Sequence, residues 1–176
     1  MKILIAYASK NGTAASCAEL LKSKLSNLDV TVVDLAKNMP DPADYDMIIS
    51  GGSVRFGKLL SPLTRFWETH KQTLLEKPLG LFFCCGNAHD YEYYHDTLLP
   101  ADLRAVAFQS LYFGGSLRRD GLPFFDKLII SSLRSSIIES EIEDGEFTPA
   151  LPSILPENVE RMATYIRMEL SKLRKE

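Results

Sequence analysis

Residues 2–13, KILIAYASKNGT, carry the clearest indication of the fold in this sequence. The first seven of these residues are almost all apolar, so Lys2–Ala8 is predicted to be a buried strand. A short polar loop follows, and residues 13–25 then show the period of a helix. The apolar side chains of this helix fall on one stripe: Cys17, Ala18, Leu21 and Leu25. A buried strand that passes through a short loop into an amphipathic helix indicates an α/β fold.

The rest of the chain repeats this alternation. Further strands are predicted at residues 30–35, 47–51, 79–85 and 105–113, and helices at 61–73 and 156–173. The pair Ser61-Pro62 is interpreted as a helix N-cap followed by proline at the first helical position. Strands separated by helices favour a doubly wound parallel sheet with helices on both faces. Ligands of such sheets bind beyond the carboxyl ends of the strands, so the loops at those ends form the candidate site.

Length and composition fit one domain, residues 1–176, without a linker or an internal repeat. The net charge of −3 gives no basic field that would attract nucleic acid. The three cysteines and three histidines show neither a disulfide framework nor metal-ligand spacing, so no metal is expected. Cys84 and Cys85 are interpreted as small hydrophobic residues at the end of a buried strand.

The N-terminus has too short an apolar run for a signal peptide, and no run of about 18 apolar residues predicts a transmembrane helix. Together with the cysteine usage, this favours a reducing cytoplasm. The sequence leaves the oligomeric state open.

The first candidate loop is Ser9-Lys10-Asn11-Gly12-Thr13. Its hydroxyl groups, together with the free amides of a helix N-terminus, can surround a phosphate. The same residue types also make an ordinary turn and helix cap, so this loop alone leaves both interpretations open.

This loop resembles the phosphate loop of flavodoxins, which usually reads Thr/Ser-x-Thr-Gly-x-Thr. The resemblance implies a flavodoxin-like sheet with strand order 2-1-3-4-5 and flavin mononucleotide (FMN) as cofactor. It places the phosphate against Ser9, Lys10, Asn11, Gly12 and Thr13. The last hydroxyl of the motif is missing, because Ala14 stands at that position. Loss of one hydrogen bond costs about 1 kcal/mol and is expected to weaken FMN binding roughly tenfold.

The second loop, residues 51–58, resembles the flavodoxin loop that lays an aromatic ring against the flavin. The resemblance implies that Phe56 flanks the ring and that the Phe56-Gly57 peptide responds to the redox state. It also brings Ser53, Val54 and Arg55 into the site. The alternative is a turn whose Phe56 is tucked into the core. Arg55 and Lys58 are expected to favour a negatively charged reduced flavin, because opposite charges attract.

The third loop, residues 85–94, is similar to the flavodoxin sequence Gly-Asp-Ser-Ser-Tyr-Glu-Tyr, in which the first tyrosine stacks on the flavin. The resemblance implies that Gly86, Asn87 and Tyr91 contact FMN, with Tyr93 as a second candidate for the stacking ring. The alternative is an aromatic patch at the start of the next helix.

Residues 114–138 form a basic and aromatic insertion that, with Ser53-Val54-Arg55-Phe56-Gly57, resembles the flavodoxin-type protoporphyrinogen dehydrogenases. Arg118 and Arg119 precede Phe124 and Phe125, and this combination can hold a planar dianionic substrate. Residues 117–134 can also make a peripheral membrane contact. The alternative is an ordinary helix that covers the sheet.

The resemblance implies an FMN-dependent oxidoreductase that oxidises a porphyrinogen-like or other small-molecule substrate. The chemistry would belong to the flavin, and no side chain is assigned as catalytic. One alternative is a flavodoxin-like electron-transfer protein that serves redox partner proteins. Another, which Ala14 keeps open, is a flavin-free module on the same fold.

Overall fold

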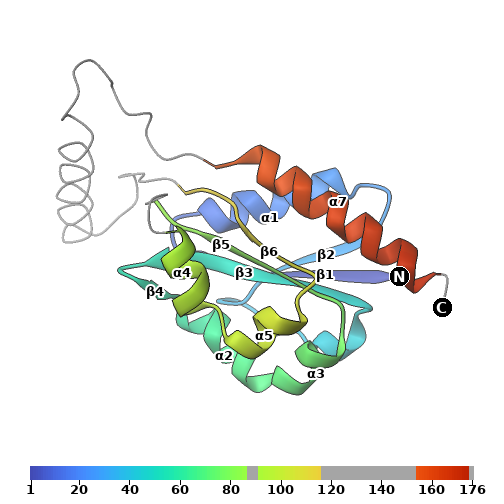
Figure 1. The fold of residues 1–176 in the computed structure, drawn as a ribbon, viewed down its shortest axis with the longest axis horizontal. Coiled ribbons are helices and arrows are strands. Elements are labelled where there is room, and N and C mark those ends of the chain that lie inside the picture. The colour runs from blue at the N-terminus through green and yellow to red at the C-terminus, as the bar shows by residue number, and fades with distance from the viewer. Residues whose placement is uncertain (87–90, 116–153, 175–176) are drawn as a thin grey trace, which may run out of the picture.

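The computed structural model describes residues 1–86, 91–115 and 154–174. They form one sheet whose five parallel strands lie in the order β2-β1-β3-β5-β6 (Figure 1). Their bounds are β1 Lys2–Ala8, β2 Asp29–Asp34, β3 Met47–Arg55, β5 Leu79–Cys84 and β6 Gln109–Tyr112. A short strand, β4 (Lys58–Leu59), pairs antiparallel with the end of β3. With this hairpin set aside, the parallel strands follow the predicted order, and the predicted doubly wound sheet is confirmed.

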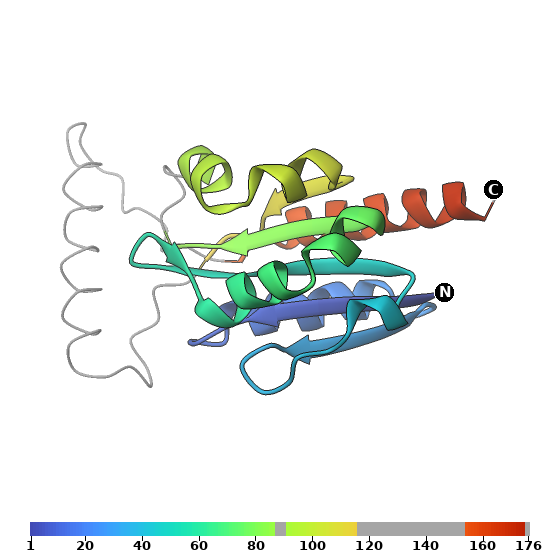
Figure 2. The same cartoon turned by 90° about the horizontal axis from the view of Figure 1, so that it is seen from below.

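Helices cover both faces of the sheet (Figure 2). One face carries α1 (Thr13–Lys24) and α7 (Pro156–Leu173). The opposite side carries the remaining helices: η1 Pro42–Asp44, α2 Ser61–Thr69, α3 Lys71–Glu76, α4 Tyr91–Leu98 and α5 Ala101–Val106. No helix in the described part of the chain is both long enough and apolar enough to span a bilayer.

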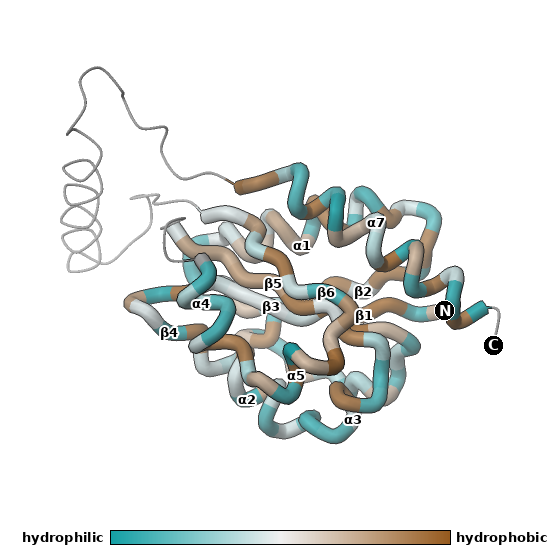
Figure 3. Tube along the Cα trace, in the orientation of Figure 1, coloured by the Kyte–Doolittle hydropathy of each residue, from teal (hydrophilic) through white to brown (hydrophobic). Residues whose placement is uncertain are grey.

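The sheet separates two hydrophobic cores. Ile3 and Ile5 of β1 pack under α1 and α7, whereas Leu4 and Ala6 pack under α2, α3 and α5. This alternation follows from the pleat of a strand, in which successive side chains point to opposite faces. Because both faces are covered, β1 needs an unbroken apolar sequence. Figure 3 shows hydrophobic colour along the central strands and hydrophilic colour on the outer turns of the helices.

Three sequence predictions about element bounds were wrong. The strand predicted at 47–51 continues to Arg55, because residues 52–53 still pair with β5 and residues 54–55 pair with β4. The helix predicted at 61–73 ends at Thr69, where His70 leaves helical geometry before α3 begins. The prediction of Ser61 as the N-cap is also wrong, because Ser61 is the first residue of the helix and Leu60 is the N-cap.

The strand predicted at 105–113 begins only at Gln109, because α5 buries Leu103 and ends at Val106. An apolar run of this length fits either the end of a helix or the start of a strand, and tertiary packing decides between them.

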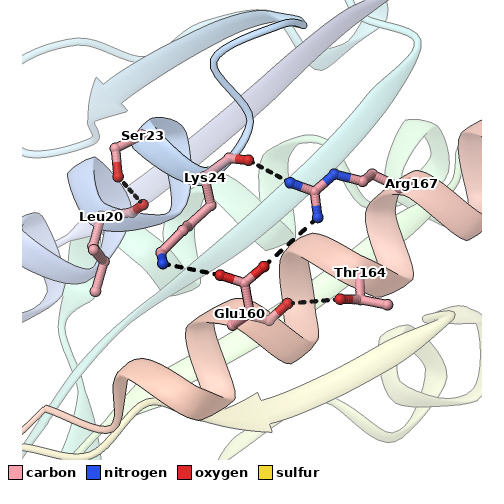
Figure 4. Close-up of polar contacts among 6 residues, drawn as sticks. All are labelled: Leu20, Ser23, Lys24, Glu160, Thr164 and Arg167. Carbon is pink, nitrogen blue, oxygen red and sulfur yellow. Dashed lines mark hydrogen bonds and ion pairs between the residues drawn. The ribbon is translucent and has the colours of Figure 1, made fainter.

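Helix α7 returns the chain to the sheet beside α1 (Figure 4). The Nζ of Lys24 lies 3.0 Å from a carboxylate oxygen of Glu160, and Arg167 donates to the backbone oxygen of Lys24 at 2.5 Å. Hydrogen bonding from Lys24 lowers the pKa of Glu160. Exposed ion pairs of this kind contribute little to stability, so the docking of α7 rests mainly on its apolar face. That face consists of Val159, Met162, Ala163, Ile166 and Leu170, all buried.

Candidate functional site

An open pocket lies at the carboxyl ends of β1, β3 and β5. It encloses about 480 Å³, its solvent-facing part included. These three strand ends are neighbours in the sheet, because Ala8 pairs with Gly52 and Ser53 pairs with Cys84. The lining residues are Lys10, Asn11, Thr13, Ser53, Val54, Arg55, Leu60, Cys84, Cys85, Gly86 and Gly115. The pocket therefore draws on all three loops that the sequence singled out.

The first loop is built around Gly12, which precedes α1 with φ 83° and ψ −11°. This left-handed conformation suits glycine, which has no Cβ to clash with the backbone. In the described part of the chain, no side chain caps the N-terminus of α1. The amides of its first turn have no partner within the helix, so they can bind an anion at this end.

Ser9 lies between β1 and this turn. Its Oγ is buried and has no hydrogen-bond partner among the described residues. A buried hydroxyl without a partner is unfavourable, so an oxygen acceptor near this loop would stabilise it.

Ala14, which stands where the flavodoxin motif has its last hydroxyl, is fully buried in the core with Cys17 and Ala18. Its side chain faces the packing between α1 and the sheet. What Ala14 offers at the site is its backbone amide, one of those in the first turn of α1.

The second loop contributes Ser53, Val54 and Arg55 to the pocket. It then turns at Phe56 and Gly57, whose φ angles are 49° and 71°. Arg55 pairs with Lys58 across this two-residue turn, as in hairpins whose central residues both have positive φ.

Phe56 is 54% exposed, and the guanidinium carbon of Arg55 lies 5.0 Å from its ring centroid. The alternative that tucks Phe56 into the core is therefore wrong. Phe56 and Gly57 are not among the residues that line the pocket.

The charged side chains that line the pocket in the described part of the chain are all cationic. Lys10 and Arg55 are both among its lining residues, and none of the lining residues in the described part of the chain is acidic. One guanidinium nitrogen of Arg55 is buried, which places part of the charge away from bulk water. Such a site favours an anionic ligand. Lys58, the other cation singled out from sequence, is exposed and does not line the pocket.

The third loop is only partly described. Gly86 lines the pocket, whereas Asn87 lies outside the described residues. Tyr91 is the first residue of α4, and its side chain is also outside the description. Tyr93 is exposed and its ring contacts that of Tyr94. The predicted insertion at 114–138 falls outside the described residues from 116 onward, with Arg118, Arg119, Phe124 and Phe125.

Four lining residues were missed from sequence: Leu60, Cys84, Cys85 and Gly115. Gly115 approaches the chain so closely that a Cβ there would lie 1.8 Å from the carbonyl oxygen of Cys85. That carbonyl also accepts a hydrogen bond from the hydroxyl of Tyr112 at 2.9 Å. For Cys84, Cys85 and Gly115, the position at or just after the ends of β5 and β6 was the available signal, because the carboxyl edge of a parallel sheet forms the binding crevice. Leu60 follows the hairpin strand β4, which was not predicted.

Fold and site together define an α/β protein with a pocket, lined by Lys10 and Arg55 among others, at the carboxyl edge of its sheet. The flavodoxin domain family matches residues 4–141, and the chain belongs to that family. No curated protein matches the chain in sequence.

Solved structures share this fold. Rubredoxin oxygen:oxidoreductase from Desulfovibrio gigas aligns with a TM-score of 0.52 and 12% identity, over 93% of this chain. The chain spans 36% of that protein's length. Oxidised flavodoxin 1 from Bacillus cereus aligns with a TM-score of 0.51 and 15% identity, over 79% of this chain and 98% of its own. A Fusobacterium nucleatum flavodoxin, solved with bound FMN, aligns with a TM-score of 0.49 and 12% identity. This alignment covers 96% of this chain and 99% of the flavodoxin. At these identities, the likeness to the first two structures, whose TM-scores exceed 0.5, shows the fold and no more.

Proposed function

We propose that the chain binds FMN in the pocket at the carboxyl edge and acts as an FMN-dependent redox protein. The observation that carries this proposal is the convergence of residues from three loops on one pocket. Lys10, Asn11 and Thr13 come from the first loop, Ser53, Val54 and Arg55 from the second, and Gly86 from the third. Membership of the flavodoxin domain family supports the same cofactor.

The residues at the first loop fit a phosphate. The buried hydroxyl of Ser9 lacks an acceptor among the described residues, Gly12 exposes the first turn of α1, and Lys10 supplies a cation. In this proposal Ser9, Asn11, Gly12, Thr13 and the amide of Ala14 hold the phosphate. The second and third loops hold the flavin ring, through Phe56-Gly57, Gly86, Asn87 and Tyr91. Bound FMN would supply hydride and electron transfer, and the protein would bind and orient it.

The phosphate fit is tested by titrating apoprotein with FMN and, separately, with riboflavin, which lacks the phosphate. Quenching of flavin fluorescence measures both dissociation constants. We expect FMN to bind at micromolar concentration or tighter, and riboflavin at least tenfold more weakly, equivalent to about 1.4 kcal/mol. Equal affinities for FMN and riboflavin would show that the first loop does not bind the phosphate.

We further propose an oxidoreductase that oxidises a small, anionic, porphyrinogen-like substrate. The resemblance at Ser53-Val54-Arg55-Phe56-Gly57 supports this substrate class, and Arg55 places a cation at the pocket. Steady oxidation of such a substrate by FMN-loaded protein, lost in Arg55→Gln, is the expected result. No turnover in the loaded wild-type protein would reject this substrate class.

An electron carrier is the second candidate. The exposed Phe56, on a turn next to the pocket-lining Arg55, offers an apolar contact for a redox partner protein. Reductive titration separates the two candidates. Accumulation of one-electron-reduced FMN favours the carrier, whereas direct two-electron reduction by a small substrate favours the enzyme.

A further inference from the structure

Cys17 and Cys84 form a thiol pair next to the pocket, of which Cys84 is a lining residue. Cys17 belongs to α1 and Cys84 ends β5, so 67 residues separate them in sequence. Their sulfur atoms lie 3.7 Å apart, with the thiol of Cys84 donating to that of Cys17. The thiol of Cys17 in turn donates to the carbonyl oxygen of Phe113 at 3.9 Å. Both side chains are buried, at 0% and 1% exposure.

We propose that Cys17 and Cys84 are a redox-active dithiol, a site at which the chain forms a reversible internal disulfide. The two sulfurs are already in contact, and bond formation needs them to approach to about 2.05 Å. The third cysteine belongs to the other core: Cys17 and Cys84 pack between the sheet and α1, whereas Cys85 packs on the opposite face. The pleat of the strand thus selects Cys84 over its neighbour.

The pocket gives a small oxidant access to this pair. Cys84 is one of the residues that line it, beside Lys10, Asn11 and Thr13. An oxidant that enters the pocket can therefore reach Cys84, whose sulfur contacts that of Cys17. Cys85 also lines the pocket, but its side chain packs in the other core, away from Cys17.

The hydrogen bond between the two thiols also shifts their pKa values in opposite directions. It lowers the pKa of Cys17 and, together with burial, raises the pKa of Cys84. Cys17 is therefore the thiol that ionises first, and its thiolate can accept the proton of Cys84.

The oxidant class is a peroxide, and the reaction balances as follows. The sulfur of Cys84 attacks one peroxide oxygen, the O–O bond breaks, and the thiol proton of Cys84 passes to the thiolate of Cys17. The departing hydroxide takes up the proton that Cys17 released on ionising. Cys84 is now a sulfenic acid. Cys17 then attacks the sulfur of Cys84, the S–S bond forms and the S–O bond breaks. The second hydroxide leaves as water with the proton of Cys17. Two thiols are oxidised to a disulfide, and one hydrogen peroxide is reduced to two waters.

Peptide mapping of the full-length chain tests this proposal. Reduced apoprotein is exposed to hydrogen peroxide, alkylated in denaturant and digested with trypsin. Cys17 is released on residues 11–22, and Cys84 and Cys85 are both released on residues 72–104 because Lys77 precedes Pro78. Fragment-ion sequencing of the cross-linked species in wild-type protein distinguishes the two cysteines without any substitution.

The matched variants are Cys84→Ala and Cys85→Ala. We expect a cross-link between Cys17 and Cys84 in wild type and in Cys85→Ala, and at least tenfold less of any cross-link in Cys84→Ala. The link is expected to disappear on addition of dithiothreitol. A Cys17–Cys85 or Cys84–Cys85 link as the main product would overturn the proposal. So would peroxide treatment that oxidises the thiols without joining them.

That the oxidant enters through the pocket rests on the proposed function, and the rate of cross-linking with and without FMN tests it separately. Saturation with FMN, checked by fluorescence quenching, is expected to slow cross-linking at least fivefold, because FMN covers the pocket in front of Cys84. If FMN quenches but cross-linking keeps its rate, the route through the pocket is wrong. If FMN does not bind, the proposed function fails, whereas the cross-link in apoprotein still decides for or against the dithiol.

Discussion

The first and second loops reach the same pocket by different physical means. The first loop presents backbone: Gly12 takes a left-handed φ of 83° and leaves the first turn of α1 open to an anion. The second loop presents side chains from a strand that continues into a hairpin, and its turn forces Phe56 to a positive φ of 49°. Glycine adopts such a conformation without strain, whereas an aromatic residue does so at a cost. The first loop is therefore locally consistent, whereas the second keeps a locally unfavourable residue, as functional positions often do.

The largest expected effect comes from Gly12→Val. Apart from Gly12 and its two chain neighbours, no heavy atom of the described residues lies within 4 Å of a Cβ built at Gly12, so the substitution acts through the backbone conformation and not through a clash. A left-handed conformation costs a β-branched residue about 2 kcal/mol, and FMN affinity should fall roughly thirtyfold if the loop relaxes to avoid it. Titration with FMN measures this loss.

Gly12→Asn is the matched control, because asparagine tolerates the left-handed region. It should retain FMN affinity within about threefold, a difference under about 0.7 kcal/mol. Equal losses in both variants would show that the backbone conformation of Gly12 is not what the phosphate requires.

The substitution Ser9→Ala is expected to change FMN affinity without lowering the stability of apoprotein. Removing the buried Oγ should weaken FMN binding about tenfold, because one hydrogen bond to the phosphate is lost. The same change should leave the stability of apoprotein unchanged or raise it, since that oxygen has no partner there among the described residues. FMN titration and urea denaturation of apoprotein provide the two readouts. Unaltered FMN affinity would take Ser9 out of the phosphate site.

Two cations of the second loop are expected to affect the redox potential of bound FMN to different extents. The substitutions that compare them are Arg55→Gln and Lys58→Gln. Arg55 lines the pocket and Lys58 does not, so the flavin should sense mainly Arg55. An interaction of about 1 kcal/mol with reduced FMN corresponds to roughly 20 mV in the two-electron potential. We expect Arg55→Gln to lower the potential by about that amount and Lys58→Gln to lower it less, as measured by redox titration. A larger shift for Lys58→Gln would contradict the arrangement of the pocket.

The smallest effect is expected from Phe56→Asn in apoprotein. Asparagine relieves backbone strain of about 1–2 kcal/mol, while the contact between Arg55 and the ring, worth about 0.5–1 kcal/mol, is lost. The net result should be a stabilisation of about 0.5 kcal/mol in chemical denaturation. FMN affinity in the same variant should fall severalfold if Phe56 flanks the flavin. A destabilised apoprotein would refute the strain at this turn.

Much of the fold could be predicted because its signals are local. The bounds of β1 and α7 agree with the predicted ones, since a continuous apolar run and an amphipathic period are both visible in sequence. The hairpin of β3 and β4 was missed, because Phe56-Gly57 is not one of the usual two-residue turn sequences. The division of the helix at His70 has no comparable signal in the sequence.

The candidate site was predictable where a strand end carries polar residues or glycine. Lys10, Asn11, Thr13 and Arg55 belong to that group, and they line one pocket. Cys84 and Cys85 were interpreted as buried hydrophobic residues. Both are buried, but they also line the pocket, because the carboxyl end of β5 forms part of its base. The contact of Cys84 with Cys17 depends on the packing of α1 against the sheet, which no local pattern in sequence specifies.

A crystal structure of the chain with FMN added at saturating concentration tests whether the pocket at the carboxyl edge binds FMN. We expect the phosphate within hydrogen-bond distance of the Ser9 hydroxyl and the first-turn amides of α1. We expect the flavin ring between the second and third loops. FMN bound elsewhere on the molecule, or an empty pocket at saturation, would contradict it.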